Sequence, residues 1–461
     1  MKNYIFSPKL IQLLFLIFPI TFVLGNGAVN ISILLISVLG IILYKEEIFR
    51  IREKKFILPI IIFFIYLIVL TIISDIRNIE KLYVPDGYYK NIETKHVIKS
   101  FLFLRYLIFM LVINCMVQKG DFKLKPFLLS CLVVSSVIAL DVIFQYFNGS
   151  NLIGFDRTTY HSPSFFDREL VSGAFIHKFF LLGILIIPVI FRKNSKIDQY
   201  LYAVFLSIGF ISIVFSGNRM PVLLILVFLS LSIFFIKELR RATIFSALIS
   251  LFFVLSFADE NLKKYYKGFS DNIIGFVNTV DYQVELTKKN KEFKYIKPKD
   301  FDGDIEKIKK DLIKQNKNII TFGGGHLIHF LTAIDVWDDN PLFGGGIRSF
   351  LIKCHSKIYL GNRACNIHPH NYYLEILVNT GIIGFVLLLL TIIFLMINRL
   401  RANSEALVSD KNKFIFYSIL FALVAEIFPI RSSGSFFSTF NAAYFFMLTG
   451  LFLSLRVDKI K

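Results

Sequence analysis

The sequence predicts an all-α membrane protein that crosses the bilayer about twelve times. Hydrophobic residues make up 55% of the 461 residues and charged residues 18%, below the roughly 25% of an average soluble domain. The apolar residues gather in runs that approach the roughly 20 residues of a spanning helix. Cations concentrate in alternate connections between these runs. The composition excludes a soluble globular domain, a disordered chain and a small disulfide-rich scaffold.

Apolar runs predict the individual spans. They lie at 10–24, 28–44, 57–74, 98–116, 126–147, 171–191, 200–215, 220–236, 242–257, 374–397, 414–430 and 436–455. Only residues 25–27 separate the first two, so these predict a helical hairpin. No cleavage pattern of a signal peptide follows the first run, so we expect it to be a span.

The charge of the connections predicts how the spans are oriented. The connection 45–55 holds five Lys or Arg residues, and 119–125, 192–196 and 237–241 hold three each. Cytoplasmic loops of membrane proteins are enriched in these residues, so we expect both termini in the cytoplasm. The same rule explains the net charge of +19, and we expect no nucleic-acid partner.

One connection is much longer than the others. Residues 258–370 separate the ninth span from the tenth and lie outside the cytoplasm by parity. The Lys-rich centre at 288–317 predicts a solvated face. Apolar residues at helical spacing in 326–337 predict a helix at the membrane interface, anchored by Trp337. The chain then divides into three parts: 1–257, 258–370 and 371–461.

Two histidines stand just before the tenth span. His368 and His370 flank Pro369, and Asn371 and Glu375 follow. The residue before a proline disfavours helix, so we expect the helix to begin after Pro369 with His370 in its first turn. A neutral imidazole there could act as a general base near neutral pH. A histidine that only shapes the start of the helix is the structural alternative.

This stretch resembles the signature of the O-antigen ligase and polymerase superfamily. The pair His370 and Asn371 is followed after nine residues by Gly381, and after two more by Gly384. Beyond the signature, S-G-N-R at 216–219 is similar to a family motif.

The letters N-P-L-F-G-G-G at 340–346 resemble another family motif, and the long external loop has the family's place in the order of spans. The resemblance covers a region of about 200–400, whereas the first five spans match only in hydropathy.

The resemblance implies an enzyme of the bacterial inner membrane that works without cofactor or metal. Such enzymes take a glycan from undecaprenyl pyrophosphate on the outer face and transfer it to another sugar. The acceptor is the lipid A core in ligases and a growing glycan in polymerases. We expect a ligase, and a polymerase of O-antigen, capsule or exopolysaccharide is the alternative that motif spacing leaves open.

A pyrophosphate leaving group calls for cations, and arginine binds phosphate oxygens through its planar fork. The resemblance makes Arg219, in the 216–219 motif, the first candidate ligand, and Arg348 is the next. Arg168 and Arg431 are weaker candidates, because an arginine near the end of a span also snorkels to the membrane surface. Further candidate substrate contacts lie in or beside the external loop: His326, His368 and Asn371.

The reaction that the resemblance implies inverts the anomeric carbon. His370 removes the proton from an acceptor hydroxyl, and the alkoxide attacks opposite the pyrophosphate. Arg219 and a second arginine stabilise the departing group.

The external loop also holds candidate metal and disulfide residues. His326 and His329 have the spacing of a zinc pair, but no third ligand stands at a clear spacing, so we expect no metal. Cys354 and Cys365 lie in the loop, and an oxidising outer compartment would permit a disulfide between them.

A transporter without catalysis is the alternative from another class. Transporters place polar groups near the midplane of their spans. The predicted spans are nearly free of charge, with Asp141 and Glu426 as the main exceptions. We expect both to be buried polar contacts between helices.

Overall fold

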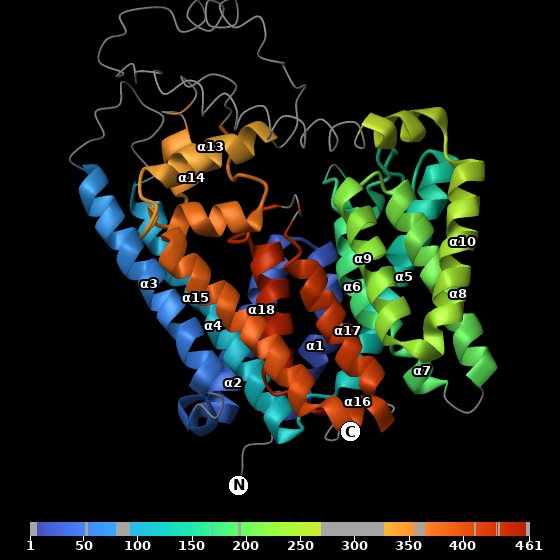
Figure 1. The fold of residues 1–461 in the computed structure, drawn as a ribbon, viewed down its shortest axis with the longest axis horizontal. Coiled ribbons are helices and arrows are strands. Elements are labelled where there is room, and N and C mark those ends of the chain that lie inside the picture. The colour runs from blue at the N-terminus through green and yellow to red at the C-terminus, as the bar shows by residue number, and fades with distance from the viewer. Residues whose placement is uncertain are drawn as a thin grey trace, which may run out of the picture.

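The fold is a bundle of helices that run lengthwise beside one another (Figure 1). The structure is a computed structural model, and it describes residues 7–50, 54–79, 93–167, 169–191, 195–268, 327–354, 357, 365–409, 412–429, 431 and 434–457. Within these residues the secondary structure is helical apart from an isolated bridge between Ser150 and Asp156. The predicted all-α class is confirmed for the described part of the chain.

Each predicted span coincides with a helix. These helices are α1 (Pro8–Val23), α2 (Asn26–Arg50), α3 (Lys54–Ile79), α4 (Glu93–Lys119), α5 (Leu124–Asn148), α6 (Ser172–Ile184), α8 (Ser195–Phe215), α9 (Arg219–Phe235), α10 (Arg240–Phe257), α15 (Tyr372–Ala402), α17 (Lys413–Glu426) and α18 (Thr439–Leu453). Among the described residues, 8 segments are long and apolar enough to cross a membrane. The shorter α1, α9, α17 and α18 are not among them, so the number twelve stays a prediction.

The outside of the bundle is apolar. Leu34 is 60% exposed, Phe252 73% and Phe394 60%, and each belongs to a helix that is long enough to cross a membrane. Soluble proteins rarely leave large apolar patches uncovered. A lipid environment removes this cost, which agrees with a multi-pass membrane protein.

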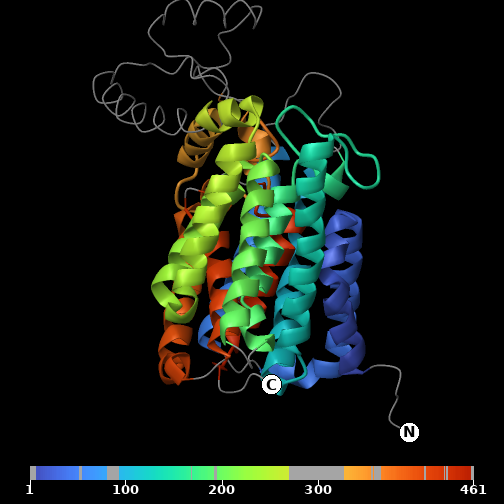
Figure 2. The same ribbon diagram turned by 90° about the vertical axis from the view of Figure 1, so that its right-hand side faces the viewer.

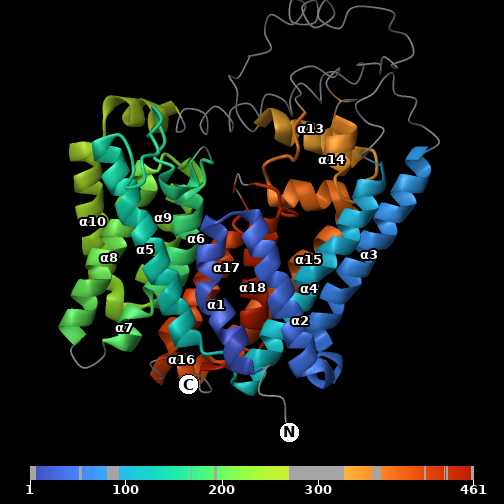
Figure 3. The same ribbon diagram turned by 180° about the vertical axis from the view of Figure 1, so that it is seen from behind.

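Two groups of helices make up the bundle. In one group α5 packs against α6 and α8, and α8 packs against α10. In the other, α4 packs against α2, α3 and α18, and α3 packs against α15. Figure 3 shows α1 between the groups, where it contacts α5 and α2, and α17 contacts α6, α9 and α18. The two groups are therefore joined by helices from opposite ends of the sequence.

Small and aromatic residues set the packing of the core. At Gly183 of α6, an added Cβ would lie 2.5 Å from the backbone nitrogen of Leu132, so α5 and α6 approach closely. Phe15 and Phe18 of α1 are fully buried, and their rings lie 5.9 and 5.5 Å from that of Phe109 in α4. Such ring pairs add to the packing of apolar surfaces.

The two ends of the bundle differ. At one end α13 (Leu327–Asp338) and α14 (Ser349–Lys353) cover the start of α15, and α7 (Ile187–Ile190) and α16 (Ser404–Ser409) lie at the other end (Figure 1). Figure 2 shows the loop 149–171 and the helical turn 260–268 at the same end as α13. The Lys-rich stretch 288–317 lies outside the described residues.

The predicted helix at 326–337 is confirmed as α13, but its buried face differs from the expected one. Ala333 and Val336 are buried against Phe350 of α14 and Val378 of α15, whereas Ile334 is 44% exposed. The small side chain of Ala333 allows α13 to pack against α14 and α15. The spacing of apolar residues does not reveal that this face of the helix is the buried one.

Candidate active site

The histidine segment lies directly before α15. Asn371 is the N-cap of this helix, and its side-chain oxygen accepts a hydrogen bond from the backbone of Leu374 at 3.1 Å. The predicted start after Pro369 is confirmed. His370, however, precedes the helix and has a positive φ of 59°, so its expected place in the first turn is wrong. A non-glycine residue in this backbone region is strained, and such residues cluster at functional sites.

Three histidines gather around this point. The rings of His368 and His370 lie 4.3 Å apart, and the ring of His329 from α13 lies 5.3 Å from that of His370. The Asn366 side-chain nitrogen lies 2.9 Å from Nε2 of His370, and the Asn366 oxygen accepts from the backbone of Ile367 at 2.7 Å. Since the amide nitrogen can only donate, Nε2 is the His370 nitrogen that carries the lone pair.

Asn371 also ties the start of α15 to the connection between α17 and α18. Its side-chain nitrogen donates to the carbonyl oxygens of Pro429 and Arg431, both at 3.1 Å. The side chain is 7% exposed. Its amide is therefore occupied by the protein, and Asn371 fixes where His370 stands.

A buried charge network centres on Glu426, the last residue of α17. The Glu426 carboxylate lies 2.5 Å from the Lys178 ammonium and 2.7 Å from the Arg431 guanidinium, and it accepts a hydrogen bond from the Tyr372 hydroxyl at 2.9 Å. All four residues are at most 5% exposed. Glu426 thus makes the polar contact between helices that the sequence predicts. Asp141 instead accepts from Ser164 and from the backbone of Leu152, both in the loop after α5.

A polar cavity of about 380 Å³ opens beside the histidine segment. It is enclosed by the α1–α2 turn, α4, α6, α9, the start of α15 and the connection before α18. The charged or ionisable residues that line it are Lys99, Glu169, His177, Arg348, His368, Glu375 and Arg431. The structure therefore brings together three of the residues predicted from sequence: Arg348, His368 and Arg431.

Sequence reasoning missed Lys99, His177 and Lys178. They lie in predicted spans, so the expectation that Asp141 and Glu426 are the main charges there is wrong. Ionisable side chains inside spans are costly and usually functional, and this signal marks all three.

Glycines hold Arg348 at the cavity. The backbone nitrogens of Gly345 and Gly346 donate to the carbonyl oxygens of Val378 and Asn379, at 3.0 and 2.9 Å. Gly381 interrupts α15 with a φ of 62°, and an added Cβ there would lie 2.2 Å from the oxygen of Leu342.

The 340–346 motif is thus packed against Gly381, the first glycine of the signature that begins at His370. Arg348 follows with a φ of 66°, and it precedes α14.

Arg219 lies near the cavity but does not line it. It begins α9, and the next two residues, Met220 and Pro221, are cavity residues. Its guanidinium lies 3.7 Å from the centre of the Tyr265 ring, and Nη2 donates to the Tyr265 carbonyl oxygen at 3.0 Å. In this structure Arg219 therefore contacts the helical turn 260–268. Arg168 and His326, two other predicted site residues, lie outside the described residues.

Cys354 at the end of α14 and Cys365 before the histidine segment form a disulfide. The bridge links the Arg348 region to the segment that carries His370. Within the described residues, no group of three His, Cys, Asp or Glu side chains could hold a metal ion.

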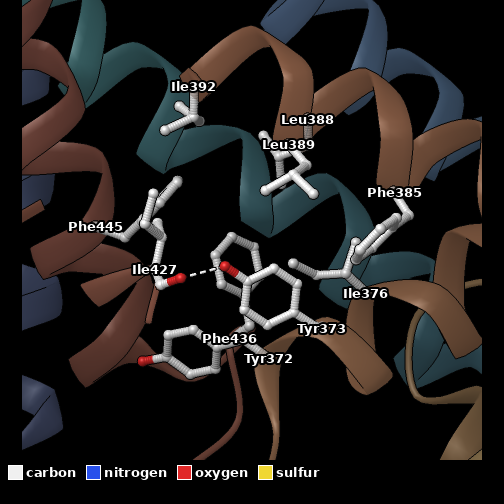
Figure 4. A pocket seen from close by; sticks show the side chains of 10 residues that line it. All are labelled: Tyr372, Tyr373, Ile376, Phe385, Leu388, Leu389, Ile392, Ile427, Phe436 and Phe445. Carbon is white, nitrogen blue, oxygen red and sulfur yellow. Dashed lines mark hydrogen bonds between the residues drawn. The ribbon is translucent and has the colours of Figure 1, made fainter. Parts of the chain in front are cut away.

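A second hollow, of about 40 Å³, is apolar (Figure 4). It lies between α15, α17 and α18, and the Tyr373 hydroxyl donates to the Ile427 carbonyl oxygen across it. No charged side chain lines it. The polar cavity is therefore the better candidate for the chemistry.

The comparisons with known proteins agree with the motifs. A sequence model of the O-antigen ligase family matches residues 202–389, which include Arg219, Arg348 and the histidine segment. No curated protein matches the chain. The match over residues 202–389 supports the O-antigen ligase and polymerase superfamily, and the apolar helices indicate a multi-pass membrane protein.

Proposed function

We propose that the chain transfers a glycan from undecaprenyl pyrophosphate to an acceptor sugar on the outer face of the bacterial inner membrane. The lipid A core is the proposed acceptor, and both termini lie in the cytoplasm. The observation that carries the proposal is the polar cavity, which Arg348 and His368 both line, with the ring of His370 4.3 Å from that of His368. A cation that lines the cavity and a base next to the cavity residue His368 suit a reaction in which a lipid pyrophosphate leaves.

His370 acts as the general base. Its Nε2 carries the lone pair and is held by the Asn366 amide, so an acceptor hydroxyl would replace that amide at Nε2. Proton transfer to Nε2 leaves an alkoxide, which attacks the anomeric carbon opposite the pyrophosphate. The bond from that carbon to the pyrophosphate oxygen breaks with its electron pair, and the configuration inverts.

The leaving group gains negative charge as its bond breaks. Arg348 lines the cavity and neutralises this charge. Arg219 is the second arginine, and it reaches the pyrophosphate only if its guanidinium leaves the Tyr265 ring. Asn371 and the Glu426 network position His370 without touching the sugar.

Deletion of the gene in the source cell, complemented with wild type or His370→Ala, tests the proposal. Long glycan that accumulates on the carrier lipid while lipid A lacks it supports the ligase. Lipid A capped with a single repeat unit would instead indicate the polymerase. Full rescue by His370→Ala would contradict the role of His370 as base.

A further inference from the structure

Lys99 is a cation in the candidate span His96–Lys119, which the O-antigen ligase match does not cover. It lies near the start of α4, and its side chain lines the polar cavity. Among the described residues it forms no ion pair or hydrogen bond through its ammonium group. A lysine in a span normally pairs with a carboxylate or reaches the membrane surface. Lys99 instead faces the cavity.

Arg348 also lines the cavity without a charged partner among the described residues. Its Nε is buried without a hydrogen-bond partner, and within the described residues its guanidinium forms no ion pair. The charge of Arg348 acts on Lys99. Two like charges that share one cavity repel each other, and burial strengthens the repulsion.

The carboxylates at the cavity offset only part of this repulsion. The charge of Glu375 attracts Lys99, and its two oxygens also accept hydrogen bonds from Ser435 and from the backbone of Phe436, both at 2.6 Å. Glu169 is exposed and forms no ion pair in the described part of the chain. Arg431, the third cation, shares the single carboxylate of Glu426 with Lys178. Lys99 and Arg348 therefore remain as a surplus of positive charge.

A third polar group at the cavity also lacks a partner. His177 of α6 is 3% exposed, and neither of its ring nitrogens has a hydrogen-bond partner among the described residues. Buried polar groups without partners cost free energy, and they mark places where a bound molecule completes the hydrogen bonds. The cavity is thus built for a polar ligand as well as for charge.

We propose that Lys99 is a substrate-binding residue, and that Lys99 and Arg348 together hold the diphosphate of the lipid-linked donor between α4 and the loop before α14. The inference rests on the proposed function, because it takes the donor class from it. Lys99 supplies a point charge and Arg348 a planar fork, so the pair can neutralise both phosphates. A bound anion relieves the repulsion that Glu375 leaves between them.

Binding of farnesyl diphosphate to the purified full chain in detergent tests this role, with farnesyl monophosphate and farnesol as comparisons. Lys99→Gln should weaken diphosphate binding at least about tenfold and leave farnesol binding unchanged. Lys99→Arg should bind within about threefold of wild type, because it keeps the charge. Lys263→Gln is the matched control, since Lys263 pairs with Glu260 on the surface.

Thermal unfolding without ligand separates substrate binding from a structural role. Because Lys99→Gln removes a repulsion, its melting temperature should equal or exceed that of wild type. A Lys99→Gln protein that binds farnesyl diphosphate as wild type does, or that loses binding together with stability, would overturn the inference. If binding depends on Lys99 but wild type transfers no glycan, the diphosphate site stands and the proposed function fails.

Discussion

Two groups of cations lie within the same bundle, and they differ in whether a carboxylate forms an ion pair with them. Lys178 and Arg431 both pair with Glu426, and Tyr372 completes the network. Lys99 and Arg348 line a cavity and have no such carboxylate among the described residues. A charge in a protein interior is tolerated when it is paired, so the first group belongs to the fold. The second group lines the cavity without an ion pair among the described residues, which is the arrangement expected of the proposed anion site.

The largest expected effect comes from removing the carboxylate that Lys178 and Arg431 share. Glu426→Ala leaves Lys178 and Arg431 buried without a counterion, so it should lower the free energy of unfolding by about 3–5 kcal/mol. Denaturant unfolding in detergent measures this. Glu260→Gln removes the exposed pair with Lys263 and should change stability by less than about 1 kcal/mol. Equal losses in both variants would mean that the network does not hold α6, α15 and α17 together.

Gly344→Ala changes the backbone of the loop that carries Arg348. The added Cβ would lie 2.4 Å from the Gly381 nitrogen, and the φ of 76° disfavours alanine. We expect a loss of about 2–3 kcal/mol in stability, and a larger relative loss of transfer because Arg348 shifts. Thermal unfolding and a transfer assay give the two numbers. Gly27→Ala is the matched control, since its Cβ would meet nothing within 4 Å.

The disulfide between Cys354 and Cys365 links the region after Arg348 to the histidine segment. A double Cys354→Ser, Cys365→Ser variant loses a short loop closure, and we expect a stability loss of about 2 kcal/mol. Reductant should lower the stability of wild type by a similar amount and leave the variant unchanged. A reductant effect of the same size on both proteins would show that the bridge is not the cause.

The smallest expected effect is a pH dependence at His161, beside Arg219. Burial lowers the pKa of His161, and the charge of Arg219 lowers it further. The unfolded chain therefore binds more protons as pH falls below about 6.5, and the folded chain loses stability in that range. His161→Gln should make the decline below about pH 6.5 shallower. An unchanged slope would indicate that His161 is protonated equally in both states.

Hydropathy and motifs predicted most of the fold and part of the site. Apolar runs locate each span because burial in lipid requires them, and the His370–Asn371 pair marks the start of α15. Lys99 and His177 lie inside apolar runs, and the sequence does not show which face of a helix lines a cavity. The direction in which the Arg219 side chain points depends on its contacts with Tyr265, which lies 46 residues away in the sequence. Such tertiary contacts have no periodic signal.

The central claim is that His370 removes the acceptor proton while other residues hold the donor. Purified wild type and His370→Ala, given an undecaprenyl-pyrophosphate glycan and an acceptor, test it when donor binding and glycan transfer are measured on the same samples. We predict that His370→Ala binds the donor within about twofold of wild type and loses at least about a hundredfold in transfer rate. Transfer by His370→Ala at close to the wild-type rate would contradict the claim.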